Sequence, residues 1–136
     1  MGVVIPHKFI ESISKSQDPR KAILDFVGDL SGIEVFGDRV LVAIYMRPEK
    51  TAGGIIRPET NKVEDVWQGK VGLVLKWGPD AFLDEDGVLY EQHVKAGEWG
   101  VFFIGDGKPI EVNKAPCRIV KSASFVSKIK DPEMVL

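Results

Sequence analysis

The first clear pattern in the chain is a stripe of apolar residues at helical spacing near the N-terminus. Asp18 is a favourable N-cap residue, and Pro19 suits the first position of a helix. Apolar side chains then recur three and four residues apart, the spacing of one helix face: Ile23, Phe26, Val27 and Leu30. Gly32 is a suitable helix end. We therefore expect residues 1–35 to form a helical extension whose apolar face packs against the following domain or a neighbouring subunit.

From residue 37 onward the pattern becomes that of strands. Residues 39–45 are nearly all apolar and rich in β-forming types, which predicts a strand covered on both faces. Residues 70–77 alternate instead, so four side chains should share one face of a second strand: Val71, Leu73, Leu75 and Trp77.

A hairpin and two further strands follow. The pair Asp86-Gly87 predicts a hairpin turn between short strands at 82–83 and 88–90. Later apolar stretches predict a strand at 99–104 and a final strand at 117–120, which precedes a charged tail.

These elements together predict a mostly β fold. Short strands separated by glycine and proline turns, with no helices between them, are typical of a small antiparallel β-barrel or sandwich. We place this domain at residues 36–128, after the N-terminal extension at 1–35 and before a C-terminal tail at 129–136.

One long segment, residues 47–68, interrupts the strands. It contains eight charged residues and two prolines, and a loop of this length inside a compact domain is uncommon and usually either functional or disordered. Within it stand two adjacent glycines and two adjacent isoleucines: Gly53, Gly54, Ile55 and Ile56. A solvated loop has no need of such a pair of isoleucines, so they should be buried somewhere. Two interpretations stand equally: the pair packs on its own barrel, or it is a hook that binds a partner.

Composition narrows the classes of function. The 136 residues suit one domain, with 44% hydrophobic and 28% charged residues, which is typical of a globular protein. Eighteen basic against twenty acidic residues give a net charge of −2, without the basic surface of a dedicated nucleic-acid binder. A single cysteine excludes an internal disulfide. No apolar run is long enough to cross a membrane and no secretory signal is visible, so we expect a cytosolic protein.

No catalytic constellation emerges from the residues. Residues 105–108 contain Gly-x-Gly-Lys but fail the spacing of a phosphate-binding loop, so a hairpin turn fits them better. Cys117 lies in an expected strand and should be a buried structural thiol. His93 has no histidine or cysteine at ligand spacing. The acidic run at 84–86 lacks the spacing of a calcium loop and suits a solvated hairpin tip. We therefore expect neither an enzyme nor a bound cofactor or metal ion.

Four motifs, in order, resemble the GroES-type co-chaperonins. They are Asp-Arg-Val-Leu-Val at 38–42, Thr-Ala-Gly-Gly-Ile-Ile at 51–56, Gly-Lys-Val at 69–71 and Val-Lys-Ala-Gly-Glu-Trp-Gly-Val-Phe at 94–102. Each alone is weak, but together with a long loop in the matching place they form a specific pattern over residues 37–122.

The resemblance implies a fold and a function. Members of this family form a small GroES-like β-barrel that assembles into a sevenfold ring and caps an ATP-driven chaperonin of the GroEL type, with the nucleotide bound by the partner. By position, Gly53, Gly54, Ile55 and Ile56 match the hook of the family's mobile loop, here 47–68. The ring closes a chamber in which the chaperonin encloses a folding protein, and residues 79–92 match the hairpin that forms the roof of this chamber. The expected function is that of a co-chaperonin in a bacterial cytoplasm.

Some features depart from the family pattern. Arg57 stands where the hook usually has a third hydrophobic residue, and Glu98 replaces the usual aspartate. The 35-residue N-terminal region has no counterpart in ordinary bacterial members and resembles the long versions carried by tailed bacteriophages. Such a version would fold a phage capsid protein with the host chaperonin. The alternative is a structural protein of the virion, such as a capsid decoration protein, that reuses the barrel without chaperonin activity and binds capsid proteins.

Overall fold

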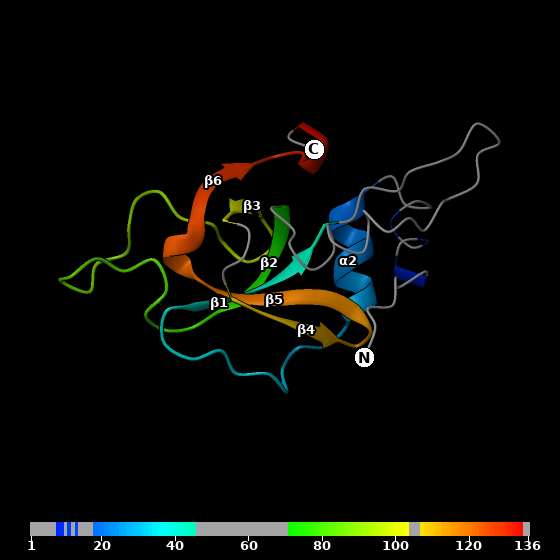
Figure 1. Ribbon diagram of the computed structural model, residues 1–136, viewed down its shortest axis with the longest axis horizontal. Coiled ribbons are helices and arrows are strands. Elements are labelled where there is room, and N and C mark those ends of the chain that lie inside the picture. Colours follow the sequence, from blue (N-terminus) through cyan, green and yellow to red (C-terminus); the bar gives the residue numbers. More distant parts are fainter. Residues whose placement is uncertain are drawn as a thin grey trace.

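The computed structural model describes residues 8, 9, 11, 13, 18–45, 71–103 and 107–134. Its main elements are a helix, six strands and two short 3-10 helices (Figure 1): α2 (Pro19–Val27), β1 (Arg39–Ile44), β2 (Val71–Trp77), β3 (Trp99–Phe102), β4 (Lys108–Val112), β5 (Ala115–Lys121), η1 (Ser122–Ser124), β6 (Phe125–Ile129) and η2 (Pro132–Met134). The strands form one sheet in the order β4-β5-β1-β2-β3-β6, and every pairing is antiparallel. The prediction of a mostly β, antiparallel fold is confirmed.

Strand β1 lies at the centre of the sheet and is buried on both faces, as predicted. It pairs with β2 on one side and with β5 on the other, and five of its six residues are buried. Its side chains alternate between two hydrophobic clusters. Leu41 and Ala43 enter the first cluster, whereas Val40, Val42 and Ile44 enter the second. The sheet therefore has a hydrophobic core on each of its two faces.

Helix α2 begins where the sequence predicts. The carboxylate of Asp18 accepts hydrogen bonds from the backbone N–H groups of Arg20 (3.1 Å) and Lys21 (3.4 Å), and proline occupies the first turn. The predicted end at Gly32 is wrong. The helix ends at Val27, because Gly28 adopts a positive φ of 68°, a non-helical conformation that glycine adopts easily.

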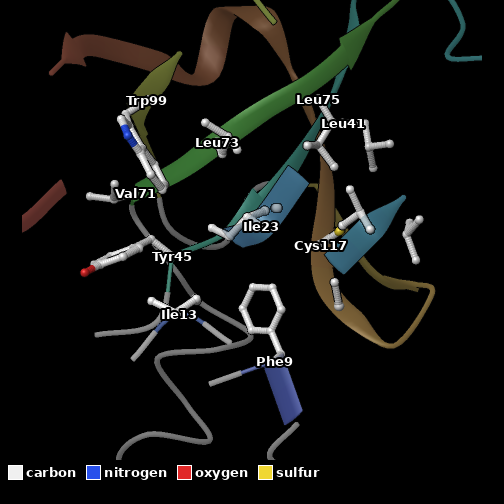
Figure 2. Packing of buried hydrophobic residues seen from close by; sticks show 14 of the residues in the cluster. Phe9, Ile13, Ile23, Leu41, Tyr45, Val71, Leu73, Leu75, Trp99 and Cys117 are labelled. Atoms are coloured by element: carbon white, nitrogen blue, oxygen red, sulfur yellow. The ribbon is translucent and has the colours of Figure 1, made fainter. Parts of the chain in front are cut away.

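The buried side of α2 packs on the first face of the sheet. Ala22, Ile23 and Val27 are buried, and the last two belong to the first cluster with Leu41 and Leu73. Figure 2 shows Ile23 between the helix and the strands, with Phe9 beside it. The amide of Asn113 also donates to the carbonyl of Val27 at the helix end. The apolar stripe of the extension thus packs against the sheet of its own chain.

Strand β2 follows the predicted alternation except at its end. Val71, Leu73 and Leu75 share the first cluster, but Trp77 packs against the second. The pairing of β1 with β2 accounts for this, because its register shifts by one residue between Leu41 and Val42. Such a bulge reverses which face the following side chains occupy. The predicted common face for all four residues is therefore wrong at Trp77.

Lys76 occupies the position that the bulge turns toward the first face. Its ammonium group donates to the carbonyls of Leu30 (2.9 Å) and Ile33 (2.6 Å), in the loop that joins α2 to β1. The side chains of Leu30 and Ile33 pack against the first cluster. The bulge thus places a cation where it satisfies two loop carbonyls.

The sequence pattern does not predict the two outer strands, β4 and β6, and β6 follows the strand expected to be the last. Residues 117–120 form the middle of β5 rather than a final strand. Strand β4 carries Pro109 and little apolar alternation, and the three central residues of β6 are exposed. Edge strands commonly have this composition, so periodicity detects them poorly. Of the strand expected at 99–104, β3 covers 99–102, and Ile104 lies outside the described residues.

We expect Ile23→Ala to lower the free energy of unfolding by about 2–5 kcal/mol, because it removes a fully buried side chain from the first cluster. The neighbouring Leu24, 39% exposed, provides the matched control, and Leu24→Ala should cost about 1 kcal/mol or less. Chemical denaturation of both variants measures the difference. Equal small losses would show that the helix contributes little to the core.

Gly107 and Gly87 provide a second matched pair, with φ 80° and 78°. A Cβ at Gly107 would lie 2.2 Å from the carbonyl oxygen of Ile119, whereas a Cβ at Gly87 would have nothing within 4 Å. We therefore expect Gly107→Ala to destabilise by about 3 kcal/mol or more and Gly87→Ala by about 1 kcal/mol. Thermal or urea unfolding checks this, and equal losses in the two variants would contradict the steric argument.

Candidate functional site

The residues expected to form the hook lie outside the described part of the chain: Gly53, Gly54, Ile55 and Ile56. What the structure describes is the frame that carries residues 46–70. The segment leaves after Tyr45 and returns at Val71, and the backbone N–H of Tyr45 donates to the carbonyl of Val71 (3.0 Å). Because β1 and β2 pair antiparallel, the segment starts and ends at the same end of two central strands.

Tyr45 fixes the point at which this segment leaves the sheet. The side chain is 7% exposed, and its ring meets the ring of Trp99 edge to face at 5.3 Å between centroids. Its hydroxyl donates to the carboxylate of Glu133 in η2. Figure 2 shows Tyr45 close to Val71 and Trp99. Sequence reasoning missed this anchor, because its partners lie far away along the chain and no local pattern links them.

A hairpin at residues 83–89 projects from the other end of β2. Leu83 and Leu89 form an antiparallel bridge, the N–H of Asp84 donates to Val88 O (2.8 Å), and the N–H of Gly87 donates to Asp84 O (3.0 Å). The hairpin predicted around Asp86-Gly87 is therefore confirmed. Its turn runs from Asp84 to Gly87, which suits a type I turn closed by a left-handed glycine.

The acidic run at the hairpin tip forms part of the turn. A carboxylate oxygen of Asp84 accepts from the backbone N–H groups of Asp86 and Val88, both at 2.9 Å. Glu85 and Asp86 are exposed to solvent. This agrees with the interpretation of a solvated tip. Within the described ranges, no three His, Cys, Asp or Glu side chains gather closely enough to hold a metal ion.

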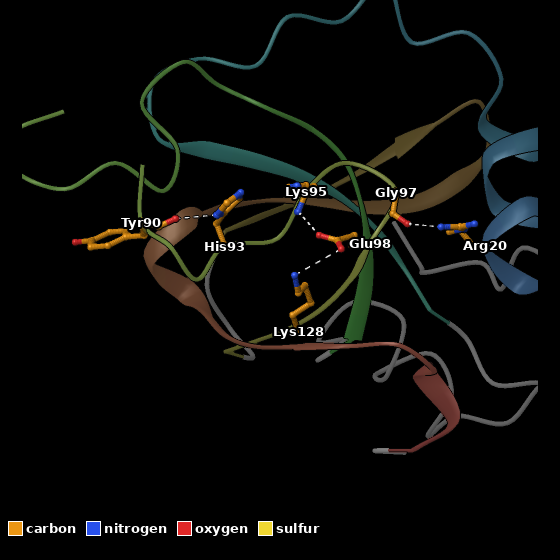
Figure 3. A network of polar contacts seen from close by, with 7 residues as sticks. All are labelled: Arg20, Tyr90, His93, Lys95, Gly97, Glu98 and Lys128. Atoms are coloured by element: carbon orange, nitrogen blue, oxygen red, sulfur yellow. Dashed lines mark hydrogen bonds and ion pairs between the residues drawn. The ribbon is translucent and has the colours of Figure 1, made fainter. Parts of the chain in front are cut away.

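A polar network holds the turn that precedes β3. A carboxylate oxygen of Glu98 accepts from the backbone N–H of Lys95 (2.8 Å), and its other oxygen lies 3.6 Å from the ammonium group of Lys128 on β6 (Figure 3). The N–H of Lys95 first, and then Lys128, holds the pKa of Glu98 below its ordinary value. Arg20 of α2 donates to the carbonyl of Gly97 (3.4 Å). Glu98 thus has a structural role in the turn.

The two candidate reactive side chains occupy structural positions. Cys117 is fully buried in β5, and burial raises the pKa of its thiol to about 12, although a backbone hydrogen bond from Val112 opposes the rise. The ring of His93 packs against Trp77 and Phe82, and its Nδ1 lies 2.7 Å from the carbonyl of Tyr90. A carbonyl only accepts hydrogen bonds, so Nδ1 carries the proton. Neither residue is arranged as a nucleophile or a metal ligand.

The sheet, the segment between β1 and β2 and the hairpin after β2 all lie within one stretch that matches a known family. The model of the family described as the chaperonin 10 kDa subunit matches residues 32–129, which include all six strands. The chain belongs to the chaperonin 10 kDa subunit family. The GroES-type resemblance of the four motifs is therefore confirmed.

Curated relatives agree with this assignment. The chain is 37% identical over 98 residues to Co-chaperonin GroES 2 of Mesorhizobium japonicum, covering 72% of this chain and 89% of the relative. It is 35% identical over 89 residues to Co-chaperonin GroES of Pelagibacter ubique, covering 65% and 88%. Over 98 residues it is 33% identical to Co-chaperonin GroES of Natranaerobius thermophilus, covering 72% and 98%.

Helix α2 lies outside the stretch that the chaperonin 10 family model matches. The match begins at residue 32, whereas α2 spans Pro19–Val27. The helix nevertheless shares the first hydrophobic cluster with β1, β2 and β5 of the family sheet. It therefore covers one face of a family fold from outside the family's own sequence. No helix in the described ranges is long and apolar enough to cross a membrane.

We expect Cys117 to resist alkylation in the native protein. With a pKa raised from 9.0 to about 12, the thiol at pH 8 carries about a thousandfold less thiolate than an exposed cysteine, and burial also blocks the reagent. Iodoacetamide labelling followed by mass spectrometry, with and without denaturant, measures this. Because the folded pKa is raised, this group favours the folded state less as pH rises from about 9 toward 12. Rapid native labelling at pH 8 would contradict the buried placement.

Proposed function

We propose that this protein is a co-chaperonin that caps an ATP-driven chaperonin of the GroEL type and assists protein folding. The observation that carries the proposal is the family match over residues 32–129, with relatives that bear the name co-chaperonin. The proposal includes a ring of seven copies, as the family resemblance implies. The virion alternative gains no support from these relatives, and it is not proposed.

The contact with the chaperonin is proposed to lie at Gly53, Gly54, Ile55 and Ile56. Burying two isoleucines is worth roughly 3–6 kcal/mol before the cost of ordering their segment is subtracted. One hook would therefore bind weakly, and several hooks on one ring would add avidity through effective concentration. Such a contact is strong enough to hold a lid and weak enough for a nucleotide switch on the partner to release.

The described anchor supports this placement of the hook. Tyr45 and Val71 hold the ends of the segment side by side through a backbone hydrogen bond, and Trp99 and Glu133 hold the Tyr45 side chain. The two ends of the segment that carries the proposed hook therefore start from one end of the central strands. The proposed function requires no catalytic group on this chain, because the chaperonin binds the nucleotide.

The proposal predicts that Ile55→Asp plus Ile56→Asp abolishes binding to the chaperonin while leaving the fold intact. The reason is that two charges cannot enter an apolar groove without a large desolvation cost. Size-exclusion chromatography with light scattering, alone and with a GroEL-type chaperonin plus nucleotide, measures both ring size and co-elution. The unchanged protein should run as a ring of about seven copies and co-elute only with nucleotide.

A control variant keeps the charge change but leaves the hook intact. Thr60→Asp plus Asn61→Asp adds the same two charges to the same segment outside the four hook residues. It should co-elute like the unchanged protein. Co-elution that survives the isoleucine changes would reject the hook, and a protein that never meets the chaperonin would reject the co-chaperonin function itself.

A further inference from the structure

The hairpin after β2 exposes three consecutive large apolar side chains. Val88 is 60% exposed, Leu89 42% and Tyr90 54%, within a run of exposed residues at 85–92. Among the residues that the structure describes, the other exposed large apolar side chains stand singly along the chain: Leu24, Phe36, Phe103, Val126 and Met134. Single exposed apolar residues are ordinary, whereas a contiguous group on a projecting element marks an interaction surface.

The backbone holds these side chains outward in a defined arrangement. The bridge between Leu83 and Leu89 fixes the register, and the N–H of Tyr90 donates to the carbonyl of Phe82 (2.8 Å). The carbonyl of Tyr90 in turn accepts from Nδ1 of His93 (2.7 Å). Figure 3 shows the ring of Tyr90 pointing away from His93 and from the strands. The fold therefore holds these apolar side chains in place, so binding a partner would cost little further conformational entropy in the hairpin.

The same stretch carries a strong local negative charge. Between Lys76 and Lys95 the chain has no lysine or arginine and five carboxylates, in a protein whose net charge is only −2: Asp80, Asp84, Glu85, Asp86 and Glu91. Asp84 is occupied within the turn, but Glu85, Asp86 and Glu91 are exposed around the apolar group. The surface thus combines an apolar strip with an acidic rim.

We propose that residues 85–92 form a docking surface for an extended polypeptide segment that carries basic residues beside apolar ones. The apolar strip requires apolar contacts, and the acidic rim selects positive charge next to them. This peptide binding goes beyond the proposed function, because a lid can close the chaperonin chamber without binding the polypeptide inside it.

Fluorescence anisotropy with a labelled peptide tests the proposal. The probe alternates lysine with leucine and phenylalanine, and the control probe has glutamate in place of lysine. The full-length protein should bind the lysine peptide, more weakly at high salt, and should not bind the glutamate peptide. Val88→Ser plus Tyr90→Ser should weaken binding by about tenfold or more, because alternate hairpin residues share a side.

Three further variants show whether binding depends on this surface alone. Phe36→Ser removes an exposed apolar side chain elsewhere (71% exposed) and should leave peptide binding unchanged. Glu85→Gln plus Glu91→Gln keeps the apolar strip and should both weaken binding and flatten its salt dependence. The Ile55→Asp plus Ile56→Asp variant should lose the chaperonin but still bind the peptide, so the two proposals fail separately.

The outcomes that overturn the proposal are equally specific. Equal binding of the lysine and glutamate peptides, or unchanged binding after the changes at Val88 and Tyr90, would reject it. A loss of self-assembly in that variant, without any peptide binding by the unchanged protein, would assign the strip to a second copy. Circular dichroism of each variant confirms folding, and the glutamine variant keeps the test valid if the serine variant does not fold.

Discussion

Burial of both faces of β1 is the constraint on which the rest of the structure depends. A strand without a polar face must be covered twice, because each exposed apolar side would cost the free energy gained by burial. Leu41 and Ala43 face the cluster that α2 covers, whereas Val40, Val42 and Ile44 face the cluster completed by residues 81–82, 94 and 102. The first cluster holds α2 on one face of the sheet, and the second holds the base of the hairpin on the other.

The central pair β1 and β2 also separates the two ends of the segment 46–70 from the base of the hairpin. The end of β2 at Val71 adjoins Tyr45, where the segment 46–70 begins, and the other end at Trp77 leads into the hairpin. At that far end the N–H of Gly78 donates to the carbonyl of Arg39 (2.9 Å), which ties the hairpin base to the start of β1. A seven-residue strand spans roughly 20 Å. The two ends of the segment 46–70 and the base of the hairpin therefore lie at opposite ends of β2.

Sequence patterns are informative where neighbouring residues determine structure and weak where distant residues decide it. The N-cap at Asp18, the two-sided burial of β1 and the hairpin after β2 follow from local chemistry alone. The end of α2 is misplaced because Gly28 and Gly32 are both acceptable stops, and only packing selects between them. The face of Trp77 follows from a bulge in strand pairing, which no single-strand pattern encodes.

The candidate site divides in the same way. Family motifs point to the hook at 53–56, which lies outside the described residues and stays a prediction, whereas the anchor of Tyr45 depends on contacts across the fold that leave no local signal.

Three reactive side chains in the described ranges have structural roles. The thiol of Cys117 is buried with a raised pKa, the carboxylate of Glu98 is held in a turn, and His93 supports the hairpin backbone. Each of these groups, which could have served catalysis, instead holds a loop or a core in place. The consecutive exposed apolar residues lie on the hairpin. The carboxylates beside them belong to a stretch of sequence, between Lys76 and Lys95, that contains no lysine or arginine. These placements agree with the proposed function, in which the chain acts by binding a partner.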